Sequence, residues 1–473
     1  MERKVVKIGF APTKRVPFNH PQTFEVRDEI RKAIAEWDLD GMIQIVDIDD
    51  VTPKNILETE DDVLAVVEKF QKEKVDGIFV PHCNFGCEAA VAGVARKLGV
   101  PVLLWGPRDE DPEIAGQQTG VGRTRDTQCG LFATGKALRR SNVTFTYVPN
   151  TTISDPTFER GYKAFAAVCA AVRDFKQTQI LQIGPRPEPF WTVMINEGEI
   201  LERFGIRVLP ITLIDLMNTA NNLRENATDR IAEAVSMITK TEEPRDLTDD
   251  HLARLAAYYL AVLDLSAEYR CNAVATSCWA AFHDAMGVAA CGINGFLHDA
   301  GIPVGCETDI HGMIGTRLLQ GASLYNSGVF FADLTIRHPY NDNAELLWHC
   351  GNFPPSVAGG DRIIYNQGRS HFEVSHDDIT LCRFDGDHGE YSMLMGEGKG
   401  VSGPKTGGTY SWFEVDDWVA WEHKIVTGPY IHHSSCTFGK HVPVLAEACR
   451  YLGIKPDLAD RDEKELKYFW FGR

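Results

Sequence analysis

The stretch EDDVLAVVEKFQKEKVDGIFVPHCNFGCEAAVAGVARKLGVPVLLWGP (60–107) decides the fold class of this 473-residue chain. Its apolar residues first follow helical spacing, then form a continuous run at 75–82, return to helical spacing up to Gly99, and end in a second run at 100–107. Strands that alternate with helices and end in short loops are typical of a parallel sheet with helical crossovers. We therefore predict a doubly wound α/β sheet.

The same alternation extends to the N-terminus and restarts later in the chain. Apolar runs at 5–12 and 43–49 predict strands, and the spacing at 24–37 predicts a helix between them. After about residue 175 the pattern begins again, which predicts a second α/β domain. Its expected elements are a strand with its following loop at 179–187, a helix at 190–205, a strand at 206–216, a helix at 248–269 and a strand at 271–279.

From about residue 350 the pattern changes to short alternating segments punctuated by Gly and Asp. This pattern is typical of antiparallel, barrel-like sheet. A helix is expected at 442–454. The sequence thus predicts an N-terminal α/β domain (1–175), a central α/β domain (176–350) and a C-terminal β-rich domain (351–473).

Composition excludes several classes of protein. The net charge of −18 argues against a nucleic-acid partner, which would need a basic face. No apolar run reaches the 18–20 or so residues that cross a bilayer, and the start of the chain lacks the apolar core of a secretion signal. Twelve cysteines without CxxC pairs favour reduced thiols. We expect a cytoplasmic protein without a membrane partner.

The segment GIPVGCETDIHGMIGTRLLQG (301–321) carries the first candidate residues. Its strand-like start ends at Glu307, and ligands of open α/β sheets sit at the carboxyl ends of strands. An apolar helical stripe follows, so Asp309 is interpreted as the N-cap of that helix. His311 is interpreted as a surface residue of its first turn.

Three further residues extend this set. Asp333 interrupts an apolar run, and a buried carboxylate needs a cation, a metal or several donors. His349 ends another apolar run; taken singly, these two fit a salt-bridged core acid and a satisfied core histidine. Together with Glu307 and His433 they form an O/N ligand set that suits Mn²⁺ or a similar divalent ion better than a structural zinc.

The pair His432 and His433 in GPYIHHSS (428–435) raises a separate question. In an extended segment neighbouring side chains point to opposite faces, so the two imidazoles are expected to serve different tasks. Trp279, at a predicted strand end, could stack on a sugar or belong to the core. Asn352 could donate to a hydroxyl or cap a turn.

The motifs CETDIHGMIGTRLLQG with VFFADLTIRHP, and GPYIHHSSCTFGKH with LAEACRYLGI, resemble the L-fucose isomerase family and the related L-arabinose isomerases. The resemblance covers essentially the whole chain. It implies that Glu307, Asp333 and His433 bind the metal and that His432 contacts the substrate. His349 matches a metal-site histidine of the arabinose isomerases, and Arg15 resembles a family arginine near the sugar; a solvent-exposed loop cation is its alternative.

The resemblance implies an aldose–ketose isomerase that uses Mn²⁺, or another divalent cation such as Co²⁺ or Mg²⁺. Glu307 and Asp333 would be the acid/base pair of a cis-enediol route, with a hydride shift as the alternative. The pattern mixes fucose and arabinose types, so L-fucose, D-arabinose, L-arabinose and an acidic or sulfonated hexose all stay open. The family also implies a homo-oligomer, with a hexamer favoured and sites near subunit contacts.

Two other functions fit the same scaffold. Two α/β domains that meet at a cleft are also the plan of sugar-binding proteins without turnover. A metal-dependent sugar epimerase or lyase could use the same ligand set.

Overall fold

The computed structural model describes residues 4–16, 20–110, 125–360 and 363–471. The chain forms two compact units, each described by itself. The N-terminal unit runs up to Arg173 and includes Ala446–Gly453 and the residues from Asp462 onward, whereas the central unit comprises Asp174–Leu445 and Ile454–Arg461. Among the helices of the described residues, none is long and apolar enough to cross a membrane.

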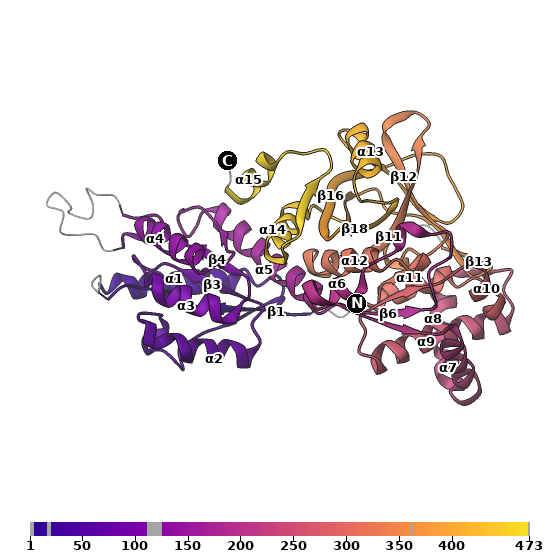
Figure 1. Ribbon diagram of the computed structural model, residues 1–473, viewed down its shortest axis with the longest axis horizontal. Helices are drawn as coiled ribbons and strands as arrows, with labels where there is room; N and C mark the ends of the chain where they lie inside the picture. Colours follow the sequence, from indigo (N-terminus) through magenta and orange to yellow (C-terminus); the bar gives the residue numbers. More distant parts are fainter. Residues whose placement is uncertain (1–3, 17–19, 111–124, 361–362, 472–473) are drawn as a thin grey trace. The chain divides into compact units, whose positions relative to one another are not determined.

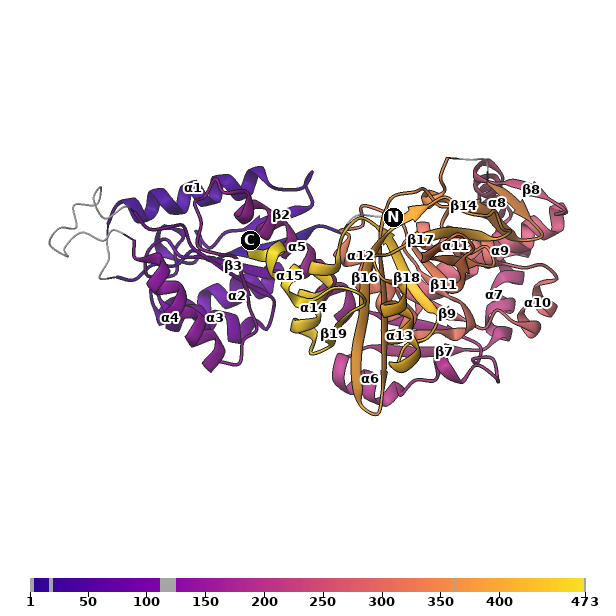
Figure 2. The same ribbon diagram turned by 90° about the horizontal axis from the view of Figure 1, so that it is seen from above.

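The described part of the N-terminal unit contains a five-stranded parallel sheet of order β2-β1-β3-β4-β5 (Figure 1). Helices α2, α3 and α4 share one hydrophobic cluster with the sheet. Helices α1 and α5 lie on the other face of the sheet (Figure 2). There Phe79 of β3 packs against Phe158 of α5, which also contacts Trp37 at the end of α1. The predicted doubly wound sheet is confirmed. The strands are β1 (Val6–Phe10), β2 (Ile43–Val46), β3 (Gly77–Pro81), β4 (Val102–Trp105) and β5 (Thr146–Tyr147), and the helices are α1 (Gln22–Glu36), α2 (Val63–Glu73), α3 (Glu88–Leu98), α4 (Thr127–Arg140) and α5 (Pro156–Lys176).

A second parallel sheet, of order β10-β9-β6-β7, lies in the central unit. The helix predicted from residue 190 begins only at Glu197, because Asn196 caps it by accepting a hydrogen bond from Glu199 N. The strand predicted to residue 216 ends at Ile211, because Thr212 caps the next helix. The strands are β6 (Gln179–Ile183), β7 (Arg207–Ile211), β9 (Ala273–Thr276) and β10 (Val304–Gly305), and the helices are α6 (Glu197–Phe204), α7 (Leu213–Asn226), α8 (Thr228–Thr241), α9 (Asp249–Glu268), α10 (Ala280–Met286), α11 (Cys291–Asp299) and α12 (Ile310–Ala322).

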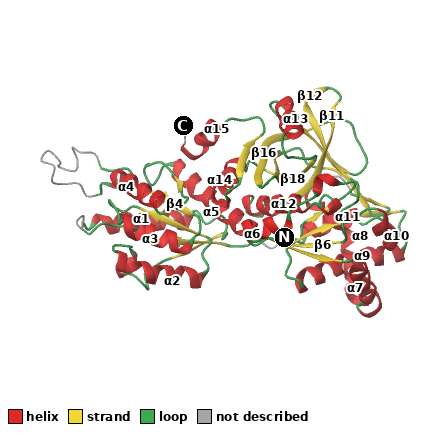
Figure 3. Ribbon diagram, in the orientation of Figure 1, coloured by secondary structure: helices red, strands yellow, loops and turns green. Residues whose placement is uncertain are grey.

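The remaining strands form a mixed sheet that closes on itself. Its order is β19-β16-β15-β18-β11-β12-β17-β14-β13-β8, and an additional pairing of β16 with β17 closes a barrel of β16, β15, β18, β11, β12 and β17. Figure 3 labels β11, β12, β16 and β18 of this region. All neighbours within this ring are antiparallel, which confirms the predicted barrel-like region. The strands of this sheet are β8 (Glu243–Arg245), β11 (Val329–His338), β12 (Asn341–His349), β13 (Ile364–Asn366), β14 (Arg369–Glu373), β15 (Asp378–Asp387), β16 (Glu390–Val401), β17 (Thr409–Glu414), β18 (His433–Phe438) and β19 (Lys455–Leu458). The remaining helices of the described chain are α13 (Trp418–Thr427), α14 (Val442–Leu452) and α15 (Glu463–Phe471), of which α15 belongs to the N-terminal unit.

Helix α12 packs closely against the barrel strands. A Cβ atom on Gly312 would lie 2.5 Å from Phe331 Cε2, and one on Gly315 would lie 3.3 Å from the Phe384 backbone nitrogen. Thr316 Oγ1 and Ser435 Oγ are 2.7 Å apart across the same contact. The glycines therefore let the N-terminus of α12 approach β11 and β18, which positions the residues that precede the helix.

Candidate metal centre

Glu307 lies in a 3-10 turn (Cys306–Thr308) that connects β10 to α12. Glu307 and Thr308 both have left-handed backbone conformations, with φ of 53° and 61°. Such a conformation is unfavourable for residues other than glycine and is held in place by the surrounding structure. The Glu307 carboxylate faces two ways: Oε1 accepts from Trp279 Nε1 at 3.2 Å, and Oε2 lies 3.6 Å from His433 Nε2.

Asp333 and His433 are register partners on β11 and β18. Asp333 Oδ1 lies 3.5 Å from His433 Nε2, and this buried oxygen has no hydrogen-bond partner among the residues described. Burial raises the pKa of Asp333 to about 7, against the charge of His433, while the nearby Glu307 and Asp309 raise it further. Glu307 and Asp333 therefore both lie beside His433 Nε2, although the three residues come from three separate elements.

A buried hydrogen-bond network orients His433 from behind. Its Nδ1 lies 2.8 Å from Asp309 Oδ2, while Asp309 Oδ1 accepts from Gly312 N at 2.9 Å, so Asp309 is the predicted N-cap of α12. Arg383 contacts Asp309 Oδ2 as well, and its Nε donates to Asp385 Oδ2 at 2.8 Å. Burial favours the neutral acid, but the charges of Arg383 and His433 outweigh it and hold the pKa of Asp309 well below its usual range.

This network fixes the chemistry of the His433 ring. Because Nδ1–H donates to an ionised Asp309, Nε2 is the nitrogen turned toward Glu307 and Asp333. Metal-binding histidines usually donate their other ring N–H to a carboxylate in this way. Burial opposes protonation, but the Asp309 hydrogen bond leaves the pKa of His433 raised in the metal-free chain.

The interpretation of His311 as a surface residue is wrong. Its side chain is 3% exposed, and Nδ1 lies 2.8 Å from Asp385 Oδ1. Asp385 comes from β15, 74 positions further along the chain, so the sequence around His311 carried no sign of its partner.

His349, at the end of β12, lies beside the three residues that converge. Its Nε2 is 4.0 Å from Asp333 Oδ1, and its Nδ1 accepts from the Cys350 backbone N–H at 2.9 Å. Burial lowers the pKa of His349 to about 3, so the ring is neutral. A neutral ring whose Nδ1 accepts carries its proton on Nε2, which makes that nitrogen a donor rather than a lone-pair ligand.

His432 departs from the alternation expected of an extended segment. It precedes β18, and its ring centroid lies 4.4 Å from that of His433. One of its ring nitrogens lies within 4.8 Å of an Asp333 carboxylate oxygen and of a His433 ring nitrogen. The two imidazoles therefore share one region rather than opposite faces. Loss of hydration and the charge of His433 lower the pKa of His432 to about 4.

Besides His432, two other predicted substrate residues, Trp279 and Asn352, contact residues of the turn that carries Glu307. Trp279 is 43% exposed and donates to Glu307, and Asn352 is fully buried, with Nδ2 3.4 Å from Cys306 Sγ. Arg15 lies in the N-terminal unit, where it pairs with Glu88 at 2.9 Å. Its role toward a sugar stays a prediction.

Sequence reasoning missed an aromatic neighbour of the site. The ring of Phe190 stacks on His433 with centroids 5.6 Å apart and packs edge-on against Trp279 at 5.9 Å. Residue 190 was expected to begin a helix, but it lies in the loop before α6. A run of aromatic residues just before a helix cap is the signal that could have indicated this position.

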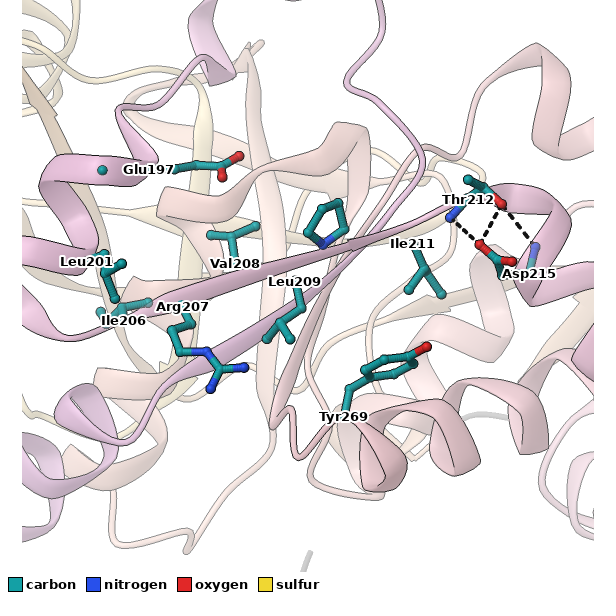
Figure 4. Close-up of a pocket in the computed structure, with 12 residues that line it drawn as sticks. Glu197, Leu201, Ile206, Arg207, Val208, Leu209, Ile211, Thr212, Asp215 and Tyr269 are labelled. Atoms are coloured by element: carbon teal, nitrogen blue, oxygen red, sulfur yellow. Dashed lines mark hydrogen bonds between the residues drawn. The ribbon is translucent and has the colours of Figure 1, made fainter.

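A separate surface cavity of about 700 Å³ runs along the edge strand β7 (Figure 4). Its wall includes Leu201, Val208 and Tyr269. Asp215 also lines this cavity, but its carboxylate already accepts hydrogen bonds from the backbone N–H and the hydroxyl of Thr212, the N-cap of α7, as the dashed lines in Figure 4 show. The cavity contains none of the predicted site residues.

The residues at the converging site fit a divalent cation. His433 Nε2 lies 3.5 Å from Asp333 Oδ1 and 3.6 Å from Glu307 Oε2, distances too long for good hydrogen bonds. His432 offers a further nitrogen within 4.8 Å of the Asp333 and His433 ligand atoms. The buried Asp333 Oδ1, which lacks a hydrogen bond within the described chain, is the kind of acceptor that a cation satisfies. Oxygen-rich sets with imidazole suit Mn²⁺-like ions.

Comparisons with known proteins agree with the motifs. A family model described as "Fucose/sulfoquinovose isomerase, N-terminal domain" matches residues 9–176. A sulfoquinovose isomerase of Alkalicoccus urumqiensis is 23% identical over 362 residues, which cover 75% of this chain and 79% of that protein. A sulfoquinovose isomerase of Priestia aryabhattai is 20% identical over 460 residues, or 94% of this chain and 97% of the relative. These similarities confirm the resemblance drawn from the sequence.

The solved structures found by comparison are distant. A periplasmic solute-binding protein from Actinobacillus succinogenes 130z, solved with D-allose, is 14% identical and has a TM-score of 0.17, with 63% of this chain and 76% of that chain covered. A solute-binding protein from Bacillus halodurans C-125 with bound myo-inositol is 11% identical, with a TM-score of 0.17 and coverage of 68% and 90%. Scores this low carry no argument about the fold.

Proposed function

We propose that the chain is a fucose isomerase-like protein and acts as a divalent-metal-dependent aldose–ketose isomerase. The observation that supports this most is the convergence of Glu307 Oε2, Asp333 Oδ1 and His433 Nε2, with the nitrogen 3.6 and 3.5 Å from the two oxygens. These three atoms would hold the ion, with Mn²⁺ as the first choice and Co²⁺ or Mg²⁺ as the others. When bound, such a cation polarises the sugar carbonyl and stabilises negative charge on the sugar oxygens.

Glu307 and Asp333 are the proposed acid/base pair. One carboxylate removes the C2 proton of the open-chain aldose and later delivers a proton to C1, while the other protonates O1 and takes the proton from O2. The ketose thus forms through a cis-enediol without net gain or loss of protons. Phe190 and Trp279 cover the site with apolar surface, which limits the access of water to these transfers.

His349 is proposed as a hydrogen-bond donor rather than as a fourth metal ligand. The Cys350 N–H occupies its Nδ1, so its proton lies on Nε2, toward Asp333. From there it can orient the Asp333 carboxylate or a sugar oxygen bound beside it. His432, an exposed residue whose ring lies against that of His433, and Trp279 are the proposed contacts to sugar hydroxyls.

The relatives named as sulfoquinovose isomerases make a sulfonated hexose the first substrate to test. The experiment is to incubate the metal-free protein, with and without Mn²⁺, with sulfoquinovose, L-fucose, D-arabinose and L-arabinose, and to follow ketose formation by NMR. We expect Mn²⁺-dependent ketose formation from at least one aldose. Binding without any product, or an epimer as the product, would refute the isomerase proposal.

Two variants connect the activity to the site. Glu307→Gln and Asp333→Asn are each expected to lower kcat by about 10²–10⁴-fold, the usual contribution of an acid or base. Glu68→Gln, an exposed carboxylate on α2, is the matched control and should keep full activity. Running the reaction in D₂O separates the routes: deuterium at C1 of the product supports the enediol, and its complete absence supports a hydride shift.

We further propose that the chain forms a closed homo-oligomer, with a hexamer favoured. The support is the family resemblance, because symmetric closed assemblies are the common form of such enzymes. Size-exclusion chromatography with light scattering gives the subunit number directly, and a monomer at working concentration would refute it.

A further inference from the structure

Two thiols lie against the Glu307 carboxylate on the side away from His433. Cys278 follows β9 and Cys306 follows β10, and these strands are parallel neighbours paired through Val274–Val304 and Ala275–Gly305. Their carboxyl ends therefore meet at one edge of the sheet. The two Sγ atoms and a Glu307 carboxylate oxygen all lie within 4.8 Å of one another.

Glu307 offers a different oxygen to each side. Oε1 accepts from Cys278 Sγ at 3.7 Å and from Trp279 Nε1, whereas Oε2 faces His433 Nε2. Its two oxygens therefore take part in two ligand sets: an oxygen–imidazole set with Asp333 and His433, and a sulfur–oxygen set with Cys278 and Cys306. The proposed isomerase mechanism uses only the first set.

A second pair of thiols nearby provides a comparison. Cys291 and Cys350 have Sγ atoms 3.4 Å apart. Within the described chain, however, no third His, Cys, Asp or Glu atom completes a ligand set around them, whereas Glu307 does so for Cys278 and Cys306. Three protein ligands with room for a fourth are what a tetrahedral thiophilic ion needs.

We propose that Cys278, Cys306 and Glu307 form a second cation site, selective for a thiophilic divalent ion such as Cd²⁺ or Zn²⁺. Two sulfur ligands exclude Mn²⁺ and Mg²⁺ in favour of soft ions, because thiolates select such metals. An ion bound there takes electron density from Glu307 through Oε1 and displaces the Trp279 hydrogen bond, so it acts as an inhibitor. The binding site stands independently of the proposed function, whereas the inhibition rests on it.

The binding is tested with Cd²⁺ alone, added to the metal-free, fully reduced chain and followed by the thiolate-to-cadmium charge-transfer absorption. We expect one equivalent to bind with the intensity of a two-thiolate site. The double variant Cys278→Ser/Cys306→Ser should lose the band and bind more than about a hundredfold more weakly, since loss of a mere outer-shell partner already costs 10–100-fold. Cys129→Ser, at an exposed cysteine of the N-terminal unit, should keep both.

Cys291→Ser/Cys350→Ser is the variant that decides between the two thiol pairs. If the band survives in this variant and disappears in Cys278→Ser/Cys306→Ser, the proposal is supported. A band lost only with Cys291 and Cys350, or present in every variant, would overturn it. Circular dichroism of each variant checks the fold, and the single variant Cys278→Ser, expected to halve the band, replaces the double variant if that one unfolds.

The inhibition is measured as ketose formation with Mn²⁺ present and Cd²⁺ added, each protein relative to its own rate without Cd²⁺. The wild type should lose activity at least tenfold as the charge-transfer band saturates, and Cys278→Ser/Cys306→Ser should resist the same Cd²⁺ concentration. A saturated band with unchanged activity would overturn the inhibition. Absence of any isomerase activity would overturn the proposed function while leaving the absorption result as it stands.

Discussion

Asp309→Asn isolates the contribution of the network behind His433. Asp309 has two oxygens with different tasks: Oδ1 caps α12 through Gly312 N, and Oδ2 accepts from His433 Nδ1 and Arg383. An asparagine that keeps its oxygen on the cap must turn its NH₂ group toward two donors. His433 can then relieve the clash only by moving its proton from Nδ1 to Nε2, which removes the lone pair offered to the metal.

The expected loss follows from this geometry. Mutating an outer-shell partner of a metal-binding histidine costs 10–100-fold in metal affinity, or about 1.4–2.8 kcal/mol. The fold should also weaken by about 3 kcal/mol, because Arg383 loses one of its two buried carboxylates. The cap itself is retained, so its usual contribution of about 1 kcal/mol is not lost.

Calorimetric titration of the metal-free protein with Mn²⁺ measures the affinity, and Asp385→Asn is the matched control. Asp385 holds Arg383 from the other side at 2.8 Å but does not touch His433. Both variants should be less stable to heat, and only Asp309→Asn should lose Mn²⁺ affinity. Equal Mn²⁺ affinity in wild type and Asp309→Asn, or an equal loss in both variants, would refute the reasoning.

Three further predictions concern other parts of the chain. Burial raises the pKa of Glu242 from 4.5 to about 8. Between these two values the folded chain keeps a proton on Glu242 that the unfolded chain has released. The free energy of unfolding should therefore fall between about pH 5 and 8, by up to about 1.4 kcal/mol per pH unit. Glu242→Gln should flatten that slope in denaturant titrations, and an unchanged slope would contradict the assignment. Gly312→Ala should destabilise by about 1–3 kcal/mol through contact with Phe331. Gly135→Ala in α4, whose new Cβ would meet only Phe145 at 3.6 Å, should stabilise by up to about 1 kcal/mol. A raised melting temperature for Gly312→Ala, or a lowered one for Gly135→Ala, would contradict the corresponding prediction. His349→Gln should lower kcat while changing Mn²⁺ affinity less than about threefold, and a loss as large as that of Asp309→Asn would make His349 a ligand after all.

The sequence predicted those site residues whose local pattern was unusual. Glu307 ended an apolar run just before a helix, and Asp333 placed a charge where none was expected, so each could be singled out without a structure. The barrel-like sheet was predictable for the same reason, since alternation over β15 to β17 is a local property. The closing pair β16–β17 was not, because register between strands depends on packing.

Residues that act through distant partners could not be predicted. Arg383 and Asp385 lie 74 positions from the acid and the histidine that they contact, and nothing near them in the sequence marks them as buried charges at a site. His432 was misjudged because the alternation rule applies within a strand, and β18 begins only at His433. The proximity of Cys278 to Cys306 likewise depends on the parallel pairing of β9 and β10.

Because Asp333 pairs with His433 across β11 and β18, metal binding at these residues depends on the correct register of the two strands. A molecule in which β18 closed one residue out of step would present Ser434 to Asp333 and turn His433 away. On the proposed assignment, such a misassembled chain would be unable to retain Mn²⁺. The Mn²⁺ content of refolded protein should therefore equal the fraction of molecules in which β18 pairs in the native register. A misfolded fraction that still binds a full equivalent of Mn²⁺ would disprove this expectation.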